Sequence, residues 1–568
     1  MLTSRLRAHA ICGAGLIAAA AILAGNVLVH PVSYAQSESG VIAESLRNRI
    51  EAAGVPPKLT VGDERIHASK ALPAFYERRG YKPAWSANGA PLPHADRLIN
   101  AIRGADREGL RAADYHLGRV ESIVGRIRAA AIDGREPSPG LLVDLDLLLT
   151  DAFMIYGSHL LVGRVNPETI DPEWVANRRD VDMAMVLQRA VDSDGIEVEL
   201  SKLLPPQPGY GRLKDALARY EDIEERGGWP SIREGDKLQV GERDSRVEIL
   251  RTRLLATGDL EAAQNDGGDE FDEPLEQAVI KFQGRHGLDP DGVVGPATLA
   301  ALNATVAQRL GQIETNLERW RWLPQDLGMR HILVNIANFE LDVVENDRIA
   351  ISMRAIVGRD YRRTPVFSDR MTYIVLSPYW NVPPGIAAND IIPAARKDPQ
   401  YLASKNIKVF QGWGADAKAV APGAVDWSAV SARGSGYRFR QDPGPTNALG
   451  RVKFMFPNKF NVYLHDTPSA ELFEKTERAF SSGCIRIEKP IELAEYVLTN
   501  DSKWTRDTIT SQIQKWKEHT VPLAEPIPVH LLYWTAWADE DGAVHFRRDI
   551  YGRDRKIEDA LERAAPKS

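Results

Sequence analysis

The sequence predicts an α+β protein built from several domains: a helical scaffold, a small helical module, and a mainly β domain with a lid insertion. Three observations predict this order. The chain has 568 residues, which corresponds to about three to four domains of the usual size. Apolar residues recur at helical spacing between residues 41 and 229. From residue 330 onward they alternate with polar residues, which is typical of half-buried strands.

Composition limits the class of protein. Hydrophobic residues make up 43% of the chain and charged residues 26%, which is typical of a globular protein and not of a disordered or polytopic membrane protein. The 71 basic residues nearly balance the 78 acidic ones. The chain therefore lacks the basic footprint of a nucleic-acid-binding protein, and we expect no nucleic-acid partner.

The N-terminal segment differs from the rest of the chain. Two arginines precede the apolar run of residues 8–29, and Ser-Tyr-Ala at residues 33–35 has the small-x-small form of a secretory cleavage site. We therefore expect residues 1–35 to be a signal peptide and the protein to be exported. The run is also long enough to remain as a single membrane anchor. Asn26 and the alanine-rich composition favour cleavage over anchoring.

Cysteine usage draws attention to one thiol. Of the two cysteines, Cys12 lies in the export segment, so the mature chain carries only Cys484 and forms no internal disulfide. A free thiol is a liability in an oxidising compartment. Two interpretations are open at this point: a buried, inert cysteine that packs as a small hydrophobic residue, or a thiol with a chemical function.

The helical scaffold is expected over residues 40–235. Its clearest element is the largely apolar stretch 141–161, which must be buried against neighbouring helices. The polar residues of this region have neither metal-ligand nor nucleophile spacing. We therefore expect a structural role for it.

The small helical module is expected over residues 240–304. Asp272 is a capping residue for a helix, and Leu275 and Phe282 lie on the apolar face of that helix. The segment AVIKFQGRHGLDPDGVVGPATLAALN (residues 278–303) resembles the peptidoglycan-binding domain, a three-helix module of many cell-wall enzymes. The resemblance implies a cell-wall ligand for this module, with a spacer role as the alternative.

The mainly β domain is expected over residues 325–555. Alternation is clear in residues 331–336 and 339–343. Between about residues 384 and 440 it gives way to Gly, Pro and Ala, which suggests an insertion that covers a site as a lid. The other strand-like segments are residues 372–376, residues 461–464, and a late hairpin of residues 529–537 and 544–546 with its turn at 539–542.

The chemistry is concentrated in YLHDTPSAELFEKTERAFSSGCIRI (residues 463–487). Gly483 lets the backbone bend ahead of Cys484, so that amides can face a developing oxyanion. A thiol needs a base near neutral pH, and His465, at the end of a strand-like segment, provides one. The alternative for His465 is a purely structural role. No paired His or Cys has metal-ligand spacing, so we expect neither a metal nor a cofactor.

The same segment resembles the active-site motif of the L,D-transpeptidase catalytic domain, also called the YkuD domain, in which His-x-Thr precedes Ser-x-Gly-Cys. Val357-Gly358 followed by Thr364-Pro365 resembles an earlier signature of that domain. The chain is most similar to the large YcbB-type branch, which joins a helical scaffold, a peptidoglycan-binding module and a catalytic domain with a lid. The segments that fit this branch are LERWRWLP (residues 317–324), WNVPPGI (residues 380–386) and RQDPGPTNALGRVKFMFPN (residues 440–458).

The resemblance implies acyl transfer on peptidoglycan stem peptides. Cys484 would attack the carbonyl of an L-centre in a stem tetrapeptide, the amides of Gly483 and Cys484 would hold the oxyanion, and His465 would protonate the departing D-alanine. An amine of a second stem then takes the acyl group and forms a 3-3 cross-link. Two alternatives are open: an L,D-carboxypeptidase or amidase acting on the same stems, and a non-catalytic wall-binding scaffold.

Two departures from the family pattern bear on the base. Ser482 stands where many relatives have a second histidine, and Asp466 stands where many have a glycine. His465 is therefore the only candidate base in the motif. Either the Asp466 carboxylate or a backbone carbonyl can orient its imidazole, and adjacent side chains on a strand point to opposite faces.

Three further residues are expected to bind substrate. Tyr463 lies two positions before His465 and should face the same side of the strand. Arg486 is placed to hold a substrate carboxylate, and Trp380 begins the lid segment. For each of the three, a packing or buttressing role is the alternative.

The resemblance also implies partners and a compartment. Peptidoglycan supplies both the donor and the acceptor stem, cell-wall synthases are candidate protein partners, and the periplasm is the expected location. Membrane contact is expected only through an uncleaved N-terminal anchor. The resemblance further implies that carbapenem-type β-lactams acylate Cys484.

Overall fold

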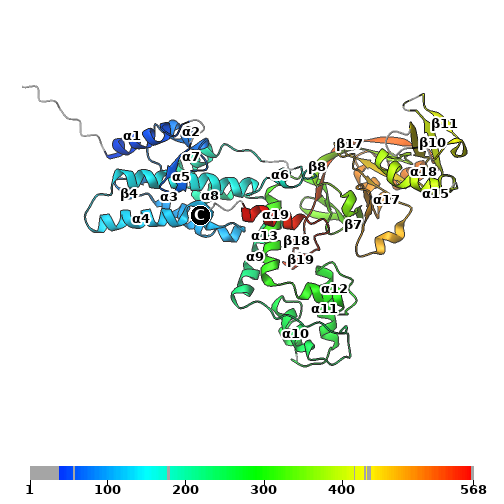
Figure 1. Ribbon diagram of the computed structural model, residues 1–568, viewed down its shortest axis with the longest axis horizontal. Coiled ribbons are helices and arrows are strands. Elements are labelled where there is room, and N and C mark those ends of the chain that lie inside the picture. Colours follow the sequence, from blue (N-terminus) through cyan, green and yellow to red (C-terminus); the bar gives the residue numbers. More distant parts are fainter. Residues whose placement is uncertain are drawn as a thin grey trace, which may run out of the picture.

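The computed structural model describes residues 38–54, 58–175, 179–265, 267–398, 400–412, 414, 416–427, 430 and 436–563. The predicted export segment, residues 1–35, lies outside the described residues. Figure 1 shows an elongated molecule in which the N-terminal helices lie at one end, the sheet of the C-terminal domain lies at the other, and the small module projects from the middle. Helical parts and a mainly β part thus follow each other along the chain, which confirms the predicted α+β class.

The N-terminal helices pack around one long helix, α5 (Pro139–Val162), which is buried along most of its length and confirms the predicted apolar helix. Its buried carboxylates Asp146 and Asp151 accept hydrogen bonds from backbone amides of earlier segments. Asp146 accepts from Ala84 and Asp151 from Ala68, both at 2.6 Å.

None of the described helices combines the length and the apolar character that a membrane crossing requires. The surrounding elements are α1 (Glu38–Glu51), α2 (Ala71–Arg78), α3 (Pro93–Arg103), α4 (Leu117–Ile132), α6 (Pro167–Ile170), α7 (Met183–Asp192), α8 (Ile196–Ser201), and the short hairpins of β1 (Thr60–Val61) with β2 (Glu64–Arg65) and β3 (Ser86–Ala87) with β4 (Ala90–Pro91).

The small module is helical, as predicted. Helices α10 (Arg246–Ala256), α11 (Glu273–Arg285) and α12 (Pro296–Leu302) enclose a core in which Leu275 and Phe282 are fully buried. The Asp272 carboxylate accepts the amide of Leu275 at 3.0 Å and so caps α11. The capping residue read from the sequence therefore performs that role.

Helices α9 (Pro208–Glu225) and α13 (Val306–Arg321) pack against each other between the scaffold and the module. The described chain ends with α19 (Arg553–Arg563), which contacts both α13 and α6. The sequence patterns did not indicate this contact, because it joins residues that are far apart in the chain.

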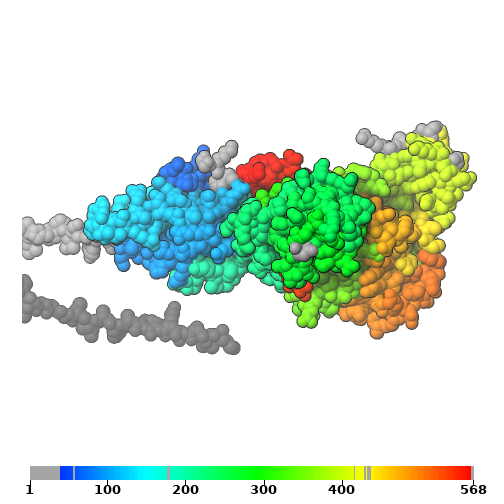
Figure 2. Space-filling model, turned by 90° about the horizontal axis from the view of Figure 1, so that it is seen from below, coloured from blue at the N-terminus to red at the C-terminus, as the bar shows by residue number. Residues whose placement is uncertain are grey.

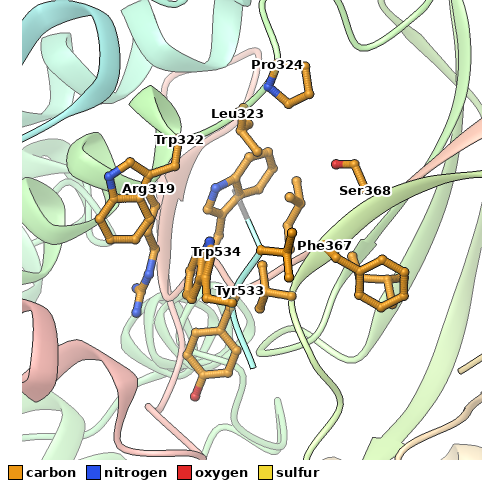
Figure 3. Close-up of a pocket in the computed structure, with 13 residues that line it drawn as sticks. Arg319, Trp322, Leu323, Pro324, Phe367, Ser368, Tyr533 and Trp534 are labelled. Atoms are coloured by element: carbon orange, nitrogen blue, oxygen red, sulfur yellow. The ribbon is translucent and has the colours of Figure 1, made fainter. Parts of the chain in front are cut away.

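A small internal void marks the junction between scaffold, α13 and sheet (Figure 3). Trp174 contributes from the scaffold, Trp322 follows α13, and Phe367 and Trp534 come from the sheet region. The void measures about 20 Å³, which is room for about one water molecule. The junction is therefore a packed interface and not a ligand site.

The C-terminal domain is built on a curved sheet with the strand order β15-β7-β16-β14-β13-β8-β17-β5-β6. Strand β6 also pairs with β7, so the sheet curls back on itself. Helices α17 (Pro490–Val497) and α18 (Arg506–Gln514) follow β16 in the chain. The strands are β5 (Arg330–Asn335), β6 (Glu340–Glu345), β7 (Arg348–Gly358), β8 (Phe367–Leu376), β13 (Val452–Met455), β14 (Leu464–His465), β15 (Ala479–Ser481), β16 (Ile485–Ile487) and β17 (His519–Leu532).

The predicted late hairpin is only partly correct. Strands β18 (Ala536–Ala538) and β19 (Val544–Phe546) do form an antiparallel hairpin. Residues 529–532, however, belong to the long strand β17, which pairs with β8 and β5 in the main sheet. The partners of a strand depend on segments that are distant in sequence, so local alternation could not assign them.

The lid insertion has a sheet and a core of its own. Its strands follow the order β11-β10-β12-β9, and Leu402, Val409 and Phe439 are buried between this sheet and short helices. The insertion is therefore a folded cover and not a plain loop. Its elements are β9 (Trp380–Asn381), α14 (Pro384–Ile386), α15 (Ile392–Lys397), α16 (Tyr401–Ser404), β10 (Ile407–Gln411), β11 (Lys418–Val420) and β12 (Tyr437–Gln441).

Candidate active site

A cavity of about 730 Å³ lies between the lid insertion and the end of the main sheet. The lid lines it with Asn389, Asp390 and Tyr401 among others. Gly483 is not part of the lining and lies in the turn ahead of the nucleophile candidate. The other residues predicted from the sequence all line this cavity: Cys484, His465, Tyr463, Arg486 and Trp380.

Strand pairing places Cys484 and His465 on neighbouring segments of the sheet. Strand β14 runs parallel to β16, with Leu464 opposite Ile485 and His465 opposite Arg486. Cys484 directly precedes β16, so it lies beside the start of β14. Tyr463 is part of the same arrangement, because its carbonyl accepts the amide of Ile485 at 3.1 Å.

A backbone carbonyl orients the imidazole of His465. The Nδ1 atom of His465 lies 2.5 Å from the carbonyl oxygen of Asp466, so Nδ1 carries the proton and donates it. The Asp466 carboxylate points elsewhere and accepts both the amide and Nε of Arg451, at 2.8 and 2.7 Å. Of the two orienting groups that the sequence left open, the structure contains the carbonyl.

His465 is neutral, and its Nε2 atom has no hydrogen-bond partner among the residues that the structure describes. The side chain is buried, and burial together with the charges of Arg486 and Lys453 lowers the pKa of its imidazole to about 3. With Nδ1 protonated, Nε2 is the atom that can accept a proton. A neutral imidazole can accept a proton at neutral pH, while the lowered pKa makes it a weak base in the absence of substrate.

The surroundings of the Cys484 thiol act in opposite directions on its pKa. Burial raises the pKa of the half-buried thiol. The amide and hydroxyl of Tyr463 and the charges of Lys453 and Arg486 lower it. The thiol itself contacts the carbonyl oxygen of Asn461 at 3.9 Å. The Lys453 ammonium lies 3.9 Å from the centre of the Tyr463 ring. These groups can stabilise a thiolate once the proton has left.

Gly483 shapes the turn that carries the thiol. Its φ of +111° favours glycine, and its amide donates to Ser481 Oγ at 3.1 Å. That amide is therefore engaged, which differs from the expectation that it faces an oxyanion. Within the described residues the Cys484 amide has no hydrogen-bond acceptor. It is a backbone donor of this turn that is not engaged within the described residues.

A buttress behind this turn explains the Val-Gly…Thr-Pro signature. The Thr364 hydroxyl donates to the carbonyl of Gly483 and accepts the amide of Gly358, both at 2.9 Å. A side chain at Gly358 would place its Cβ 2.1 Å from the carbonyl oxygen of Arg362, so only glycine fits there. The signature residues thus hold the turn and do not line the cavity.

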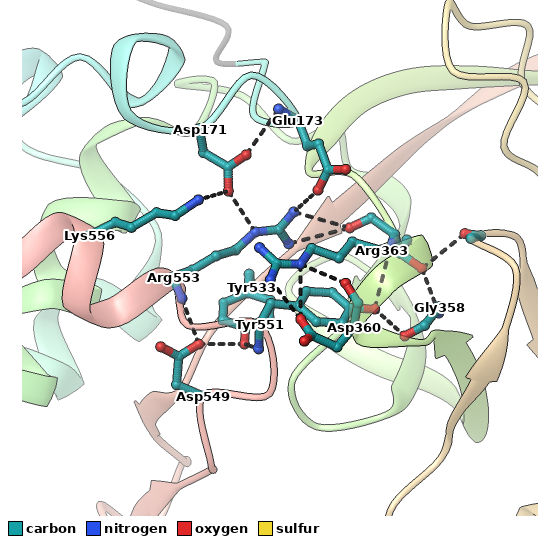
Figure 4. Close-up of polar contacts among 12 residues, drawn as sticks. Asp171, Glu173, Gly358, Asp360, Arg363, Tyr533, Asp549, Tyr551, Arg553 and Lys556 are labelled. Atoms are coloured by element: carbon teal, nitrogen blue, oxygen red, sulfur yellow. Dashed lines mark hydrogen bonds and ion pairs between the residues drawn. The ribbon is translucent and has the colours of Figure 1, made fainter.

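The buttress is tied to the scaffold by one buried arginine, Arg553 of α19 (Figure 4). Its guanidinium donates to Asp171 at 3.0 Å and to Glu173 at 3.1 Å, both in the segment after α6. It also donates to the carbonyl of Thr364 at 3.3 Å. This connection was not predicted, because no local pattern marks an arginine for a partner almost 400 residues earlier.

Arg486 and the lid present charged groups to the cavity. Arg486 is half-buried, and its Nε atom has no hydrogen-bond partner in the part of the chain that the structure describes. The Arg362 guanidinium binds Asp390 of the lid at 2.6 Å and Ser482 Oγ at 2.8 Å, so it joins the lid to the nucleophile turn. Sequence reasoning missed Arg362, although it lies inside the Val-Gly…Thr-Pro segment.

The rate of Cys484 alkylation by iodoacetamide is expected to rise with pH, with a midpoint above the usual thiol pKa of about 8.5. Burial raises the thiol pKa, and His465, with a pKa of about 3, stays neutral and adds no step near pH 6.5. Mass spectrometry of the labelled peptide between pH 5 and 10 measures this profile. A midpoint below pH 7 would instead indicate a preformed thiolate–imidazolium pair.

Comparisons with protein families agree with the resemblance read from the sequence. Residues 329–510 match the L,D-transpeptidase catalytic domain (YkuD), and residues 243–302 match the "Putative peptidoglycan binding domain". Residues 70–217 match a family described as "Scaffold domain". The resemblance of these two segments to the catalytic domain and to the peptidoglycan-binding domain is thereby confirmed. Among the described residues no group of three or more His, Cys, Asp or Glu side chains could hold a metal ion.

Individual relatives cover only parts of the chain. It is 34% identical over 254 residues to a "Putative L,D-transpeptidase" of Haemophilus influenzae, which covers 45% of this chain and 50% of that protein. It is 39% identical over 89 residues to the N-acetylmuramoyl-L-alanine amidase CwlM of Mycobacterium tuberculosis, over 14% of this chain and 22% of that protein. The chain thus spans half the length of the first relative and less of the second. A further match is the crystal structure of the L,D-transpeptidase (residues 123–326) from Xylanimonas cellulosilytica, at 16% sequence identity. The match covers 53% of this chain and 99% of the chain in that structure. Its TM-score of 0.17 is too low to compare the folds.

Proposed function

Because this chain carries an L,D-transpeptidase catalytic domain and a peptidoglycan-binding domain, we propose that it forms 3-3 cross-links between peptidoglycan stem peptides. The observation that carries the proposal is a cavity beside the lid that is lined by both Cys484 and the neutral His465. A nucleophile, a base and a covered cavity are the parts that acyl transfer to an amine requires.

In the first half-reaction the thiol forms a thioester. Nε2 of His465 takes the proton of Cys484, and the sulfur attacks the carbonyl of the third residue of a donor tetrapeptide. The C–S bond forms, the C–N bond to the terminal D-alanine breaks, and His465 returns the proton to the departing amine. The carbonyl of Asp466, which holds Nδ1, keeps Nε2 directed at the reacting atoms.

The tetrahedral intermediate needs donors for its oxyanion. The Cys484 amide, which has no acceptor within the described residues, is one candidate. The hydroxyl of Tyr463, which lines the same cavity, is the second. In this proposal Gly483 contributes the backbone turn, while Arg486 attracts an anionic group of the stem.

The second half-reaction transfers the acyl group. A side-chain amine of a neighbouring stem attacks the thioester, its proton passes to His465, and the thiol of Cys484 is restored. The lid favours this acceptor over water, because a covered cavity limits solvent access. The carboxypeptidase alternative requires the same residues and differs only in the acceptor.

The remaining assignments follow from the same proposal. Residues 1–35 direct export to the periplasm, residues 40–235 form the scaffold, residues 240–304 bind peptidoglycan, and residues 325–555 catalyse, with Trp380 at the edge of the lid. Cell-wall synthases remain candidate partners. Carbapenem-type β-lactams, which react with thiols as acyl donors, are expected to acylate Cys484.

Product analysis tests the proposed reaction. The purified protein is incubated with disaccharide tetrapeptides, and the products are read by mass spectrometry next to a Cys484→Ala control. We expect dimers that have lost one D-alanine, and we expect none with the control. Tripeptide monomers without dimers would identify a carboxypeptidase, and unchanged substrate with a folded protein would contradict both activities.

A further inference from the structure

A second large cavity lies where the small module meets the catalytic domain. It measures about 540 Å³ and is separate from the cavity around Cys484. Figure 2 shows the module (green) lying against the catalytic domain (orange). The module contributes Leu288, Asp289 and Pro296 among others, and the catalytic domain contributes Asn338 and Glu477 among others. We call this space the interdomain cleft.

Two arginines hold the walls of the interdomain cleft, the buried Arg285 and the half-buried Arg547. Arg547 of the catalytic domain donates to the carbonyl of Arg285 at 2.9 Å, at the C-terminal end of α11, where the helix dipole favours a cation. Arg285 in turn donates to the carbonyl of Val544 at 3.1 Å. A Cβ at Gly287 would lie 2.5 Å from Arg547 Cδ, so glycine permits the close contact. The cleft is therefore a defined feature and not a gap between loosely joined domains.

The lining of the cleft is charge-balanced. Three guanidinium groups face three carboxylates there, and burial lowers the pKa of His286 well below its usual value, so that it adds no charge. A cleft without net charge does not favour the binding of a polyanionic ligand. The charged groups are the guanidinium groups of Arg478, Arg547 and Arg548 and the carboxylates of Asp289, Asp291 and Glu477.

Polar groups lie next to small apolar surfaces in the same cleft. Asp289 and Glu477 are exposed. Within the described residues each has one partner, Asp289 the hydroxyl of Thr476 and Glu477 the guanidinium of Arg548, and a carboxylate can accept further hydrogen bonds. Leu288 and Pro296 supply apolar contacts. Hydroxyl and acetamido groups of a neutral sugar find hydrogen-bond partners in such a lining, while the ring faces find apolar ones.

One short strand connects the cleft with the active site. Arg478 lines the cleft, and Phe480 and Ser481 line the cavity around Cys484. Between them runs β15, which is an edge strand because it pairs with β7 only. Three residues of extended chain span about 10 Å. In a stem peptide, three residues separate the sugar from the reacting carbonyl, and in extended form they span about the same distance of 10 Å.

We propose that the interdomain cleft binds the amino-sugar backbone of the same peptidoglycan strand whose stem peptide runs along β15 to Cys484. The inference rests on the proposed function for the identity of the stem. It assigns the sugar neither to the module alone nor to the catalytic domain alone. The site exists only where the two meet, so the module positions a substrate for the chemistry.

Two substrates and two matched variants test this site. The substrates are the disaccharide tetrapeptide and the free tetrapeptide without sugar. Ala297→Trp places a bulky side chain in the cleft from an exposed position on α12. Ala300→Trp changes an equally exposed alanine on the same helix that does not line the cleft. Binding is measured in the Cys484→Ala background, and turnover with Cys484 intact.

We expect Ala297→Trp to weaken binding of the disaccharide tetrapeptide about tenfold, which corresponds to one decade in Kd. The free tetrapeptide should bind and react equally with and without this substitution, and Ala300→Trp should change neither. Equal binding of both substrates by the unsubstituted protein, or an unchanged affinity in Ala297→Trp, would overturn the cleft assignment. Absence of turnover with intact binding preferences would count against the proposed reaction and leave the cleft assignment in place.

Discussion

Replacement of His465 by alanine is expected to lower the rate of thioester formation by a factor of about 100 to 10,000, the usual contribution of a general base. The imidazole is neutral, Nε2 is the free acceptor, and no second histidine lines the cavity in the described part of the chain. Without it, solvent must take the proton of a thiol whose pKa burial raises. Release of D-alanine in single-turnover experiments measures the effect.

Two controls separate the base from its surroundings. His519→Ala removes an exposed histidine on β17 outside the cavity and should leave the rate unchanged. Asp466→Asn keeps the carbonyl that orients the imidazole and should cost far less than His465→Ala. A loss in Asp466→Asn as large as that in His465→Ala would mean that the carboxylate orients the base. An unchanged rate in His465→Ala would exclude His465 as the base.

Substitution of Arg553 by methionine is expected to lower the free energy of unfolding by about 3–5 kcal/mol, the usual cost of breaking a buried ion pair by removing one partner. The Arg553 and Asp171 side chains are 1% and 6% exposed, so the substitution leaves Asp171 as a buried charge without its closest partner (Figure 4). The guanidinium also lies 5.0 Å from the ring centres of Tyr533 and Tyr551. Urea denaturation followed by tryptophan fluorescence measures the loss.

The Arg553→Met substitution should also disturb the turn that carries Cys484. Arg553 holds the carbonyl of Thr364, and the hydroxyl of Thr364 holds the carbonyl of Gly483. We therefore expect a lower kcat in the fraction that remains folded. Arg563→Met is the matched control on the same helix, because the Arg563 side chain is 78% exposed and its removal should cost little. A loss below about 1 kcal/mol for Arg553→Met would show that the contact is not a structural link.

Much of the site could be read from the sequence because its signals are local. A glycine before a cysteine, a histidine at the end of a strand-like segment and a tyrosine two positions earlier are all visible within residues 463–487. The structure places His465, Tyr463 and Cys484 in one cavity. Arg362 escaped notice because its partners, Asp390 and Ser482, lie in other segments and nothing near it in sequence marks them.

The sequence by itself determined the features that depend on short-range physics. The cap of α11 at Asp272 and the apolar course of α5 follow from hydrogen bonds and burial within a few helical turns. The choice between the two groups that could orient His465 was different. It was decided by the bond from Arg451, just before β13, to the carboxylate of Asp466, just after β14.

Only the tertiary structure decided how the parts act on one another. The separate sheet of the lid, the tie from Arg553 to Asp171 and the cleft between module and catalytic domain all join segments that are distant in the chain. Periodicity and capping describe what one segment does with its own neighbours. Which segments then meet depends on the packing of the whole chain, where contacts between remote residues compete, and no local pattern records the outcome.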